Sequence, residues 1–197
     1  MKYPEYVRVN GRLYKIRTDF RIALRCNEIA NDNNIGDYER ALGIICTLYE
    51  NGLDNSEDYT KLLELATKYL SCGKELESNS ERTEPDMDYS EDMDYIEASF
   101  MSDYHIDLAN IEMHWWKFNN LINGLSNSEM GNCCVLNRIR NLRTYDTKGI
   151  KDPKERAKIE KAKQQVALKR YKKENNLTKE QEESMKRLDE ILRMGGK

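Results

Sequence analysis

The two histidines are the first side chains in this sequence that could do chemistry. His105 and His114 are nine positions apart, which places them on opposite sides of a single helix because each helical residue advances by about 100°. A zinc ion needs three or four converging ligands, so this pair would need a turn between the histidines and further ligands from Asp103, Asp107 or Glu112. We expect surface or hydrogen-bonded histidines and no metal site.

The cysteines are the second candidates for reactive groups. Cys133 and Cys134 are adjacent, and Arg138 and Arg140 follow them, an arrangement that could lower the pKa of a thiol. The chain has five cysteines, an odd number, and no Cys-x-x-Cys pair. We therefore interpret them as core thiols of a reducing compartment.

Motifs for catalysis and cofactor binding are absent from the sequence. It has no phosphate-binding P-loop, no glycine-rich dinucleotide motif, no zinc-protease helix motif and no nucleophile elbow. We expect no catalytic residue, no cofactor and no enzymatic activity. Apolar runs also fall short of the roughly 18–20 residues that span a bilayer, and no apolar stretch follows the N-terminus. Neither membrane insertion nor secretion is expected.

The charges of the chain fall into three blocks that almost cancel. The net charge of the 197 residues is -3, but residues 1–72 carry -1, residues 73–112 carry -11 and residues 113–197 carry +9. A basic region can bind phosphate groups without any specific motif. Because this one also contains 11 acids, nucleic-acid binding by the basic C-terminal helices is the alternative function and not the main one. The opposite charges also suit contacts between copies of the chain.

The elements that must position these residues are mostly helical. Val7-Arg8-Val9 and Leu13-Tyr14-Lys15-Ile16 alternate around Asn10-Gly11, which predicts a β-hairpin. Apolar residues then recur every three or four positions, which predicts helices. These helices open, in chain order, near Phe20, Tyr38, Tyr59, Tyr95, Ile111, Cys134, Pro153 and Thr178. The expected fold is mainly α, with a short N-terminal β-hairpin and long charged C-terminal helices.

Four segments follow from this pattern. They are a hairpin plus helical unit (1–73), an acidic flexible linker (74–94), an aromatic-rich helical region (95–150) and charged C-terminal helices (151–197). The linker is predicted because nine of the residues 74–94 are acids and few are large and apolar, too few to offset the entropy cost of ordering. An acidic arm that screens the basic half, or that mimics nucleic acid, is the alternative.

Both tryptophans of the chain are adjacent in the aromatic-rich region. Trp115 and Trp116 point about 100° apart on a helix and cannot both face one neighbour. We expect Trp115, like Phe118, to lie in the core, and Trp116 to meet a second element or a partner.

Three motifs of the sequence point to a known family. They are Tyr95-Ile96-x-Ala98-x-Phe100-x-x-x-Tyr104-x-Ile106-Asp107-Leu108, Met113-His114-Trp115-Trp116-x-Phe118-x-x-Leu121 with Gly124-Leu125, and Tyr14-x-Ile16-x-Thr18-Asp19-Phe20-Arg21. Together they resemble the "gene product fifteen" family of bacteriophages and prophages of Gram-positive bacteria. The resemblance covers most of residues 10–145. It implies a helical tail assembly chaperone that binds the phage tape-measure protein and helps recruit tail-tube subunits. Such a protein acts in the host bacterial cytoplasm and is absent from the mature virion.

A protein that coats a long apolar helical chain needs exposed apolar grooves and adaptable methionine and aromatic side chains. Residues of that kind lie in the aromatic-rich region and in the last predicted helix. The predicted partner-binding residues are Tyr104, Met113, His114, Trp116, Met185, Leu188 and Leu192.

Overall fold

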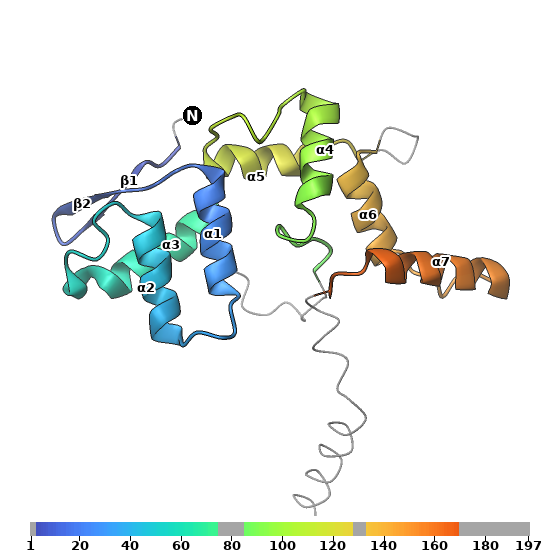
Figure 1. Ribbon diagram of the computed structural model, residues 1–197, viewed down its shortest axis with the longest axis horizontal. Coiled ribbons are helices and arrows are strands. Elements are labelled where there is room, and N and C mark those ends of the chain that lie inside the picture. Colours follow the sequence, from blue (N-terminus) through green and yellow to red (C-terminus); the bar gives the residue numbers. More distant parts are fainter. Residues whose placement is uncertain (1–2, 75–84, 128–132, 170–197) are drawn as a thin grey trace, which may run out of the picture. The chain divides into compact units, whose positions relative to one another are not determined.

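The computed structural model describes residues 3–74, 85–127 and 133–169 of the chain. In that part the structure has seven α-helices, one short 3-10 helix and one two-stranded sheet (Figure 1). The predicted mainly helical fold with an N-terminal β-hairpin is confirmed. The helix predicted to open near Thr178 lies outside the described residues. The chain forms two compact units, one of residues 1–83 and 92–138 and the other of residues 84–91 and 139–197.

The first unit begins with the predicted hairpin. Strands β1 (Tyr6–Val9) and β2 (Arg12–Lys15) are antiparallel. Asn10 and Gly11 both have positive φ, 48° and 81°, as this two-residue turn requires. The inner face of the hairpin is buried through Val9 and Tyr14, so the hairpin lies on the helices that follow it, as Figure 1 shows.

Three helices and a 3-10 turn support the hairpin. They are α1 (Phe20–Ala30), α2 (Asp37–Leu48), η1 (Ser56–Asp58) and α3 (Tyr59–Leu70). The carboxylate of Asp58 is fully buried at the start of α3. It accepts hydrogen bonds from Asn10 Nδ2 (2.7 Å), Arg12 Nη1 (3.1 Å) and Tyr14 Oη (2.6 Å). These bonds fix the hairpin to α3. Tyr38, where the apolar recurrence of α2 starts, is 68% exposed.

Most of the aromatic-rich region, from residue 95 to residue 138, belongs to the same unit. It contains α4 (Met93–Tyr104) and α5 (Trp115–Asn123), and α5 lies across the start of α1 in Figure 1. Helix α5 begins four residues after the predicted start at Ile111. Phe20 N–H donates to the Met113 carbonyl and Trp115 N–H to the Thr18 carbonyl, both at 2.8 Å. These long-range bonds hold the backbone before Trp115 in an extended form.

Four rings form what we call the aromatic stack: Phe20, Phe100, Trp115 and Phe118. Phe118 is fully buried and stacks on Phe20 (4.4 Å between ring centroids), Phe100 (5.3 Å) and Trp115 (5.8 Å). The stack joins α1, α4 and α5, and it confirms that Trp115 and Phe118 lie in the core.

The second unit contains helix α7 (Pro153–Val166) and the C-terminal part of α6 (Val135–Thr144). Asp152 caps α7 through a hydrogen bond from Lys154 N–H, with proline in the first turn, as the Asp-Pro pair predicts. No side chain of α7 is buried.

The acidic segment has specific contacts where the structure describes it. Residues 75–84 of the predicted linker lie outside the described residues. In the second unit, the Asp86 carboxylate pairs with Arg140 Nη2 (2.8 Å), and its carbonyl accepts from Arg143 Nη1 (2.9 Å). In the first unit, Asp92 is fully buried just before α4. Within residues 85–94, Asp86 thus has basic partners and Asp92 is buried.

Candidate partner interface

His114 is the N-terminal cap of α5. Its Nδ1 accepts a hydrogen bond from Trp116 N–H (3.0 Å), and its Nε2 lies 3.1 Å from the Pro4 carbonyl oxygen. Since Nδ1 must accept, Nε2 carries the proton and donates to that carbonyl. Burial lowers the pKa of His114 below its ordinary value, so the neutral ring that this cap requires is favoured.

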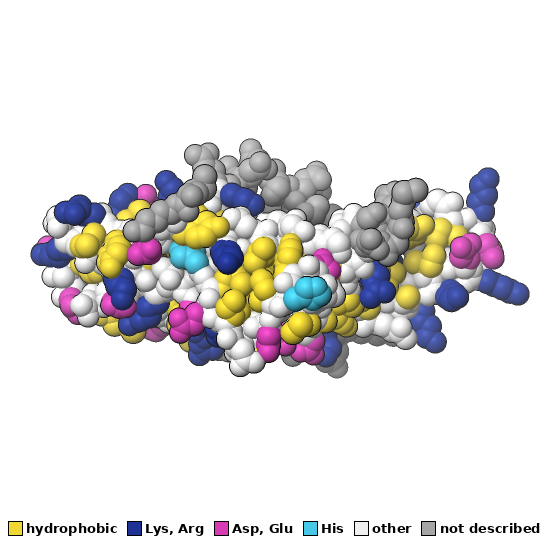
Figure 2. All heavy atoms as spheres, turned by 90° about the horizontal axis from the view of Figure 1, so that it is seen from above, with side chains coloured by type: hydrophobic (Ala, Val, Ile, Leu, Met, Phe, Trp, Pro, Cys, Tyr) yellow, Lys and Arg dark blue, Asp and Glu magenta, His cyan; other side chains and the backbone are white. Residues whose placement is uncertain are grey.

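Around His114 lies a group of rings that we call the aromatic cluster: Tyr3, Tyr69, His114 and Trp116. Tyr3 stacks on His114 at 4.8 Å between centroids, and Tyr69 lies 5.9 Å from His114 and 6.1 Å from Trp116. Tyr69 is buried, whereas Tyr3, His114 and Trp116 remain half-buried. In the view of Figure 2, hydrophobic side chains (yellow) lie between the two histidine side chains (cyan).

Trp116 meets a second element, as predicted. Its Nε1–H donates to the Tyr69 carbonyl at the end of α3 (2.9 Å). The ring also packs beside Gly73, where a Cβ would lie 3.3 Å from the indole. Gly73 has a φ of 75°, so a glycine there permits both the turn after α3 and the close approach of the ring.

The other predicted partner-binding residues are not in this cluster. Met113 is only 4% exposed and so offers no surface in this conformation. Tyr104 is half-buried, packs on Phe100 and donates from its hydroxyl to the Leu121 carbonyl (2.9 Å). Met185, Leu188 and Leu192 lie outside the described residues.

Two members of the cluster were missed by the sequence interpretation. Tyr3 lies before the hairpin, and Tyr69 lies near the end of α3. Both are far from His114 in the sequence, so no local spacing indicates the contact. The one local signal is that Tyr69 precedes the turn at Gly73.

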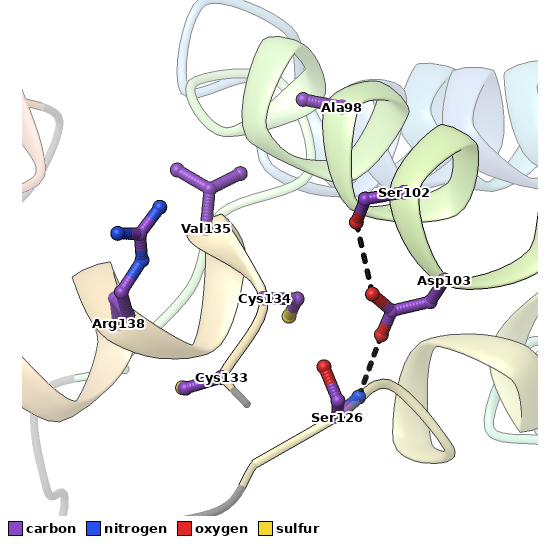
Figure 3. A pocket seen from close by; sticks show the side chains of 8 residues that line it. All are labelled: Ala98, Ser102, Asp103, Ser126, Cys133, Cys134, Val135 and Arg138. Atoms are coloured by element: carbon purple, nitrogen blue, oxygen red, sulfur yellow. Dashed lines mark hydrogen bonds between the residues drawn. The ribbon is translucent and has the colours of Figure 1, made fainter. Parts of the chain in front are cut away.

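A separate cavity of about 550 Å³ lies between α4 and the start of α6 (Figure 3). Asp103 accepts hydrogen bonds in it from the Ser126 backbone N–H (2.8 Å) and the Ser102 hydroxyl (2.9 Å). These bonds lower the pKa of Asp103. Cys133 and Cys134 line the cavity, and burial raises the pKa of Cys133. A thiol activated by the nearby arginines is therefore not supported at Cys133.

The described residues contain no group of three or more His, Cys, Asp or Glu side chains that could hold a metal ion. Within the same residues, no helix is both long and apolar enough to cross a membrane.

A comparison with known protein families shows which family the chain belongs to. The model of the family described as bacteriophage Gp15 protein matches residues 2–168. The chain belongs to this phage family. The match extends beyond the motifs at both ends and includes α7. Comparisons with curated proteins and with solved structures found no match.

The basic side chains of this phage protein are partly occupied by internal contacts. Three of these side chains, Arg138, Arg140 and Arg143, lie on α6. Arg138 is exposed, but Arg140 and Arg143 are half-buried and bonded to Asp86. Arg143 also donates to the Val166 carbonyl (2.6 Å), so it caps the end of α7. Four exposed cations of the described second unit lie on α7, and Lys148, Lys151 and Lys169 lie on either side of it in the sequence.

Proposed function

We propose that this phage protein is a tail assembly chaperone that binds the tape-measure protein and helps recruit tail-tube subunits. It acts without catalysis, in the host cytoplasm, and leaves before the virion is mature. Membership of the phage family supports a role in phage production. The observation that carries the proposal further is the aromatic cluster, which keeps ring surface available on a rigid support.

The cluster has the properties of a preorganised binding surface. His114 and Trp116 are each held by hydrogen bonds to backbone groups of other segments. Rings fixed in this way lose little side-chain entropy on binding. Tryptophan, tyrosine and histidine rings beside apolar neighbours suit a long helical partner whose apolar residues lie along one face.

A co-purification assay tests this proposal. The tagged chain is expressed with the tape-measure protein of the same phage, and the amount of bound partner is compared with that for Tyr3→Ala. Removing one ring of the cluster is expected to weaken binding by about five- to thirtyfold. Tyr38→Ala is the matched control, because it removes the same ring from a 68% exposed position on α2. Equal binding by all three chains contradicts the role of the cluster.

Absence from the virion is a second consequence of the proposal. Mass spectrometry of purified particles is expected to detect tube and tape-measure proteins without this chain. Detection at a level comparable to the tape-measure protein would instead indicate a structural tail component.

Helix α7 favours nucleic-acid binding as the second candidate function. None of its side chains is buried, and five of them are basic against two acids: Lys154, Arg156, Lys158, Lys161 and Lys163 against Glu155 and Glu160. Arg156 pairs with Glu160, and Lys163 donates to the Tyr145 carbonyl, whereas Lys154, Lys158 and Lys161 are exposed. Exposed cations bind duplexes through phosphates, with an affinity that falls steeply with salt. A mobility-shift assay at low salt that shows no binding removes this candidate.

A further inference from the structure

Strand β1 has an edge that no other part of the described chain covers. Ile16 N–H donates to the Glu5 carbonyl (2.8 Å), and bonded pairs alternate along an antiparallel ladder. Val7 and Val9 therefore bond to β2, whereas Tyr6 and Arg8 direct their N–H and C=O groups outward. Within the described residues, no backbone bond reaches these four groups.

The edge of β2 is different, because the end of α2 covers part of it. Glu50 N–H donates to the Lys15 carbonyl (2.9 Å), and Arg17 N–H donates to the Leu48 carbonyl (2.8 Å). Of the two strands that the structure describes, only β1 therefore offers a complete short edge for pairing with another strand.

The outer face of the hairpin is half apolar and half basic. Tyr6 is 48% and Leu13 is 58% exposed, and Arg8 and Lys15 lie beside them on the same face. Lys15 pairs with Glu50 at 2.9 Å. For Arg8, by contrast, the described part of the chain provides no ion pair.

We propose that β1 pairs in antiparallel fashion with β1 of a second copy of the chain and so forms a four-stranded sheet. In this arrangement Val7 lies opposite the partner's Val7. Tyr6 and Arg8 lie opposite the partner's Arg8 and the partner's Tyr6. The outward backbone groups of both strands then form two bonded pairs.

The side chains select this register over its neighbours. A shift in one direction places Arg8 opposite the partner's Arg8, and like charges in directly opposed positions are destabilising. A shift in the other direction places Arg8 opposite the partner's Pro4, which has no N–H to donate. The central register avoids both costs.

The side chains that are opposed in the central register, an arginine and a tyrosine, suit one another. On the outer face each Arg8 lies between Leu13 of its own hairpin and the ring of the partner's Tyr6. A guanidinium beside a tyrosine ring gains a cation–π contact. Because only one short strand from each copy contributes, the interface is small, and the association is weak and reversible.

Sedimentation equilibrium of the full chain, in reducing buffer and over a wide range of concentration, tests the proposal. The wild-type chain is expected to show a reversible equilibrium between monomer and dimer. Tyr6→Glu places a carboxylate opposite the partner's Arg8 and is expected to keep the dimer.

The decisive comparison is Arg8→Glu in two backgrounds. In the wild-type background it is expected to raise the dissociation constant by about fivefold, since the contact with a tyrosine ring is lost at two symmetric positions. In the Tyr6→Glu background the same substitution sets carboxylates opposite one another at two symmetric positions. We expect it to raise the dissociation constant there by at least about tenfold more than in the wild-type background. Arg8 lies opposite Leu13 within its own hairpin, so the substitution creates no charge clash there.

A covalent readout reports the register directly. Val7→Cys brings two thiols together across the symmetry axis, with Cβ atoms about 4.5–5.5 Å apart, so mild oxidation is expected to link the dimer. Leu13→Cys is more exposed but has no such partner and is the control. Monomer at every concentration, equal effects of Arg8→Glu in both backgrounds, or cross-linking by Leu13→Cys alone would each overturn the proposal.

Discussion

Phe118→Ala is the substitution that most directly perturbs the support of the aromatic cluster. Phe118 is fully buried in the aromatic stack, with ring centroids of three neighbours within 5.8 Å. It lies on α5, the helix whose first residues present His114 and Trp116. Removing its ring therefore weakens the connection of α5 to α1 and α4.

The expected cost can be estimated from burial and ring contacts. Truncation of a buried phenylalanine to alanine costs about 3–5 kcal/mol of unfolding free energy, of which each ring pair contributes roughly 0.5–1.5 kcal/mol. Phe118→Leu keeps most of the side-chain volume and is expected to cost about 1.5 kcal/mol. The free energies of unfolding of the two variants should thus differ by about 1.5–3.5 kcal/mol.

Urea unfolding followed by tryptophan fluorescence measures this difference. The only two tryptophans of the chain are in α5, and Trp115 stacks on Phe118, so the signal reports the first unit. The free energy is obtained by linear extrapolation to water. A loss below about 1 kcal/mol for Phe118→Ala, or equal losses for both variants, would refute the view that the stack holds α5 in place.

Three further predictions concern the turn after α3, the helix cap and the buried carboxylate. Gly73→Ala introduces a Cβ at a φ of 75° and is expected to lower the free energy of unfolding by about 1 kcal/mol. Gly149→Ala is the control, because its Cβ meets no atom within 4 Å, and it should leave that free energy unchanged. Because burial lowers the pKa of His114, the unfolded chain takes up a proton at higher pH than the folded chain does. The free energy of unfolding should therefore fall as the pH decreases below about 6.5. His114→Asn keeps a helix cap and should make that free energy, measured by urea titration, depend less on pH. The Tyr14 hydroxyl is the main cause of the lowered pKa of Asp58, so Tyr14→Phe should raise that pKa in a carboxyl NMR titration and shift acid unfolding to higher pH.

Local signals in the sequence were sufficient for the hairpin and for the start of α7. Asn10-Gly11 can adopt the two positive φ angles of a tight turn. The Asp152 side chain caps the first turn of α7, and Pro153 fits the first position of that helix. In both cases the residues that determine the structure are neighbours in the chain. That is why the spacing alone predicts the element.

Long-range hydrogen bonds explain where the prediction was wrong. The apolar spacing from Ile111 indicates a helix, but backbone bonds from Phe20 and Trp115 to distant carbonyls keep the residues before α5 extended. Helical periodicity contains no information on such partners. The late start of α5 makes His114 a cap, which the sequence interpretation did not foresee.

The candidate site could be predicted in part for the same reason. The choice of His114 and Trp116 came from one motif in one segment, whereas Tyr3 and Tyr69 join them only through the tertiary fold. The block charges also gave partial information. They indicated regions of opposite charge, but the pairing of Asp86 with Arg140 depends on how the second unit folds.

The solubility of the tape-measure protein is the most direct test of the proposed chaperone function. The tape-measure protein of the same phage is expressed alone and together with this chain, and its soluble fraction is measured in both cases. The proposed function predicts that the protein is insoluble alone and becomes soluble, and co-purifies, when this chain is present. Equal insolubility in both cases, with no complex recovered, would contradict it.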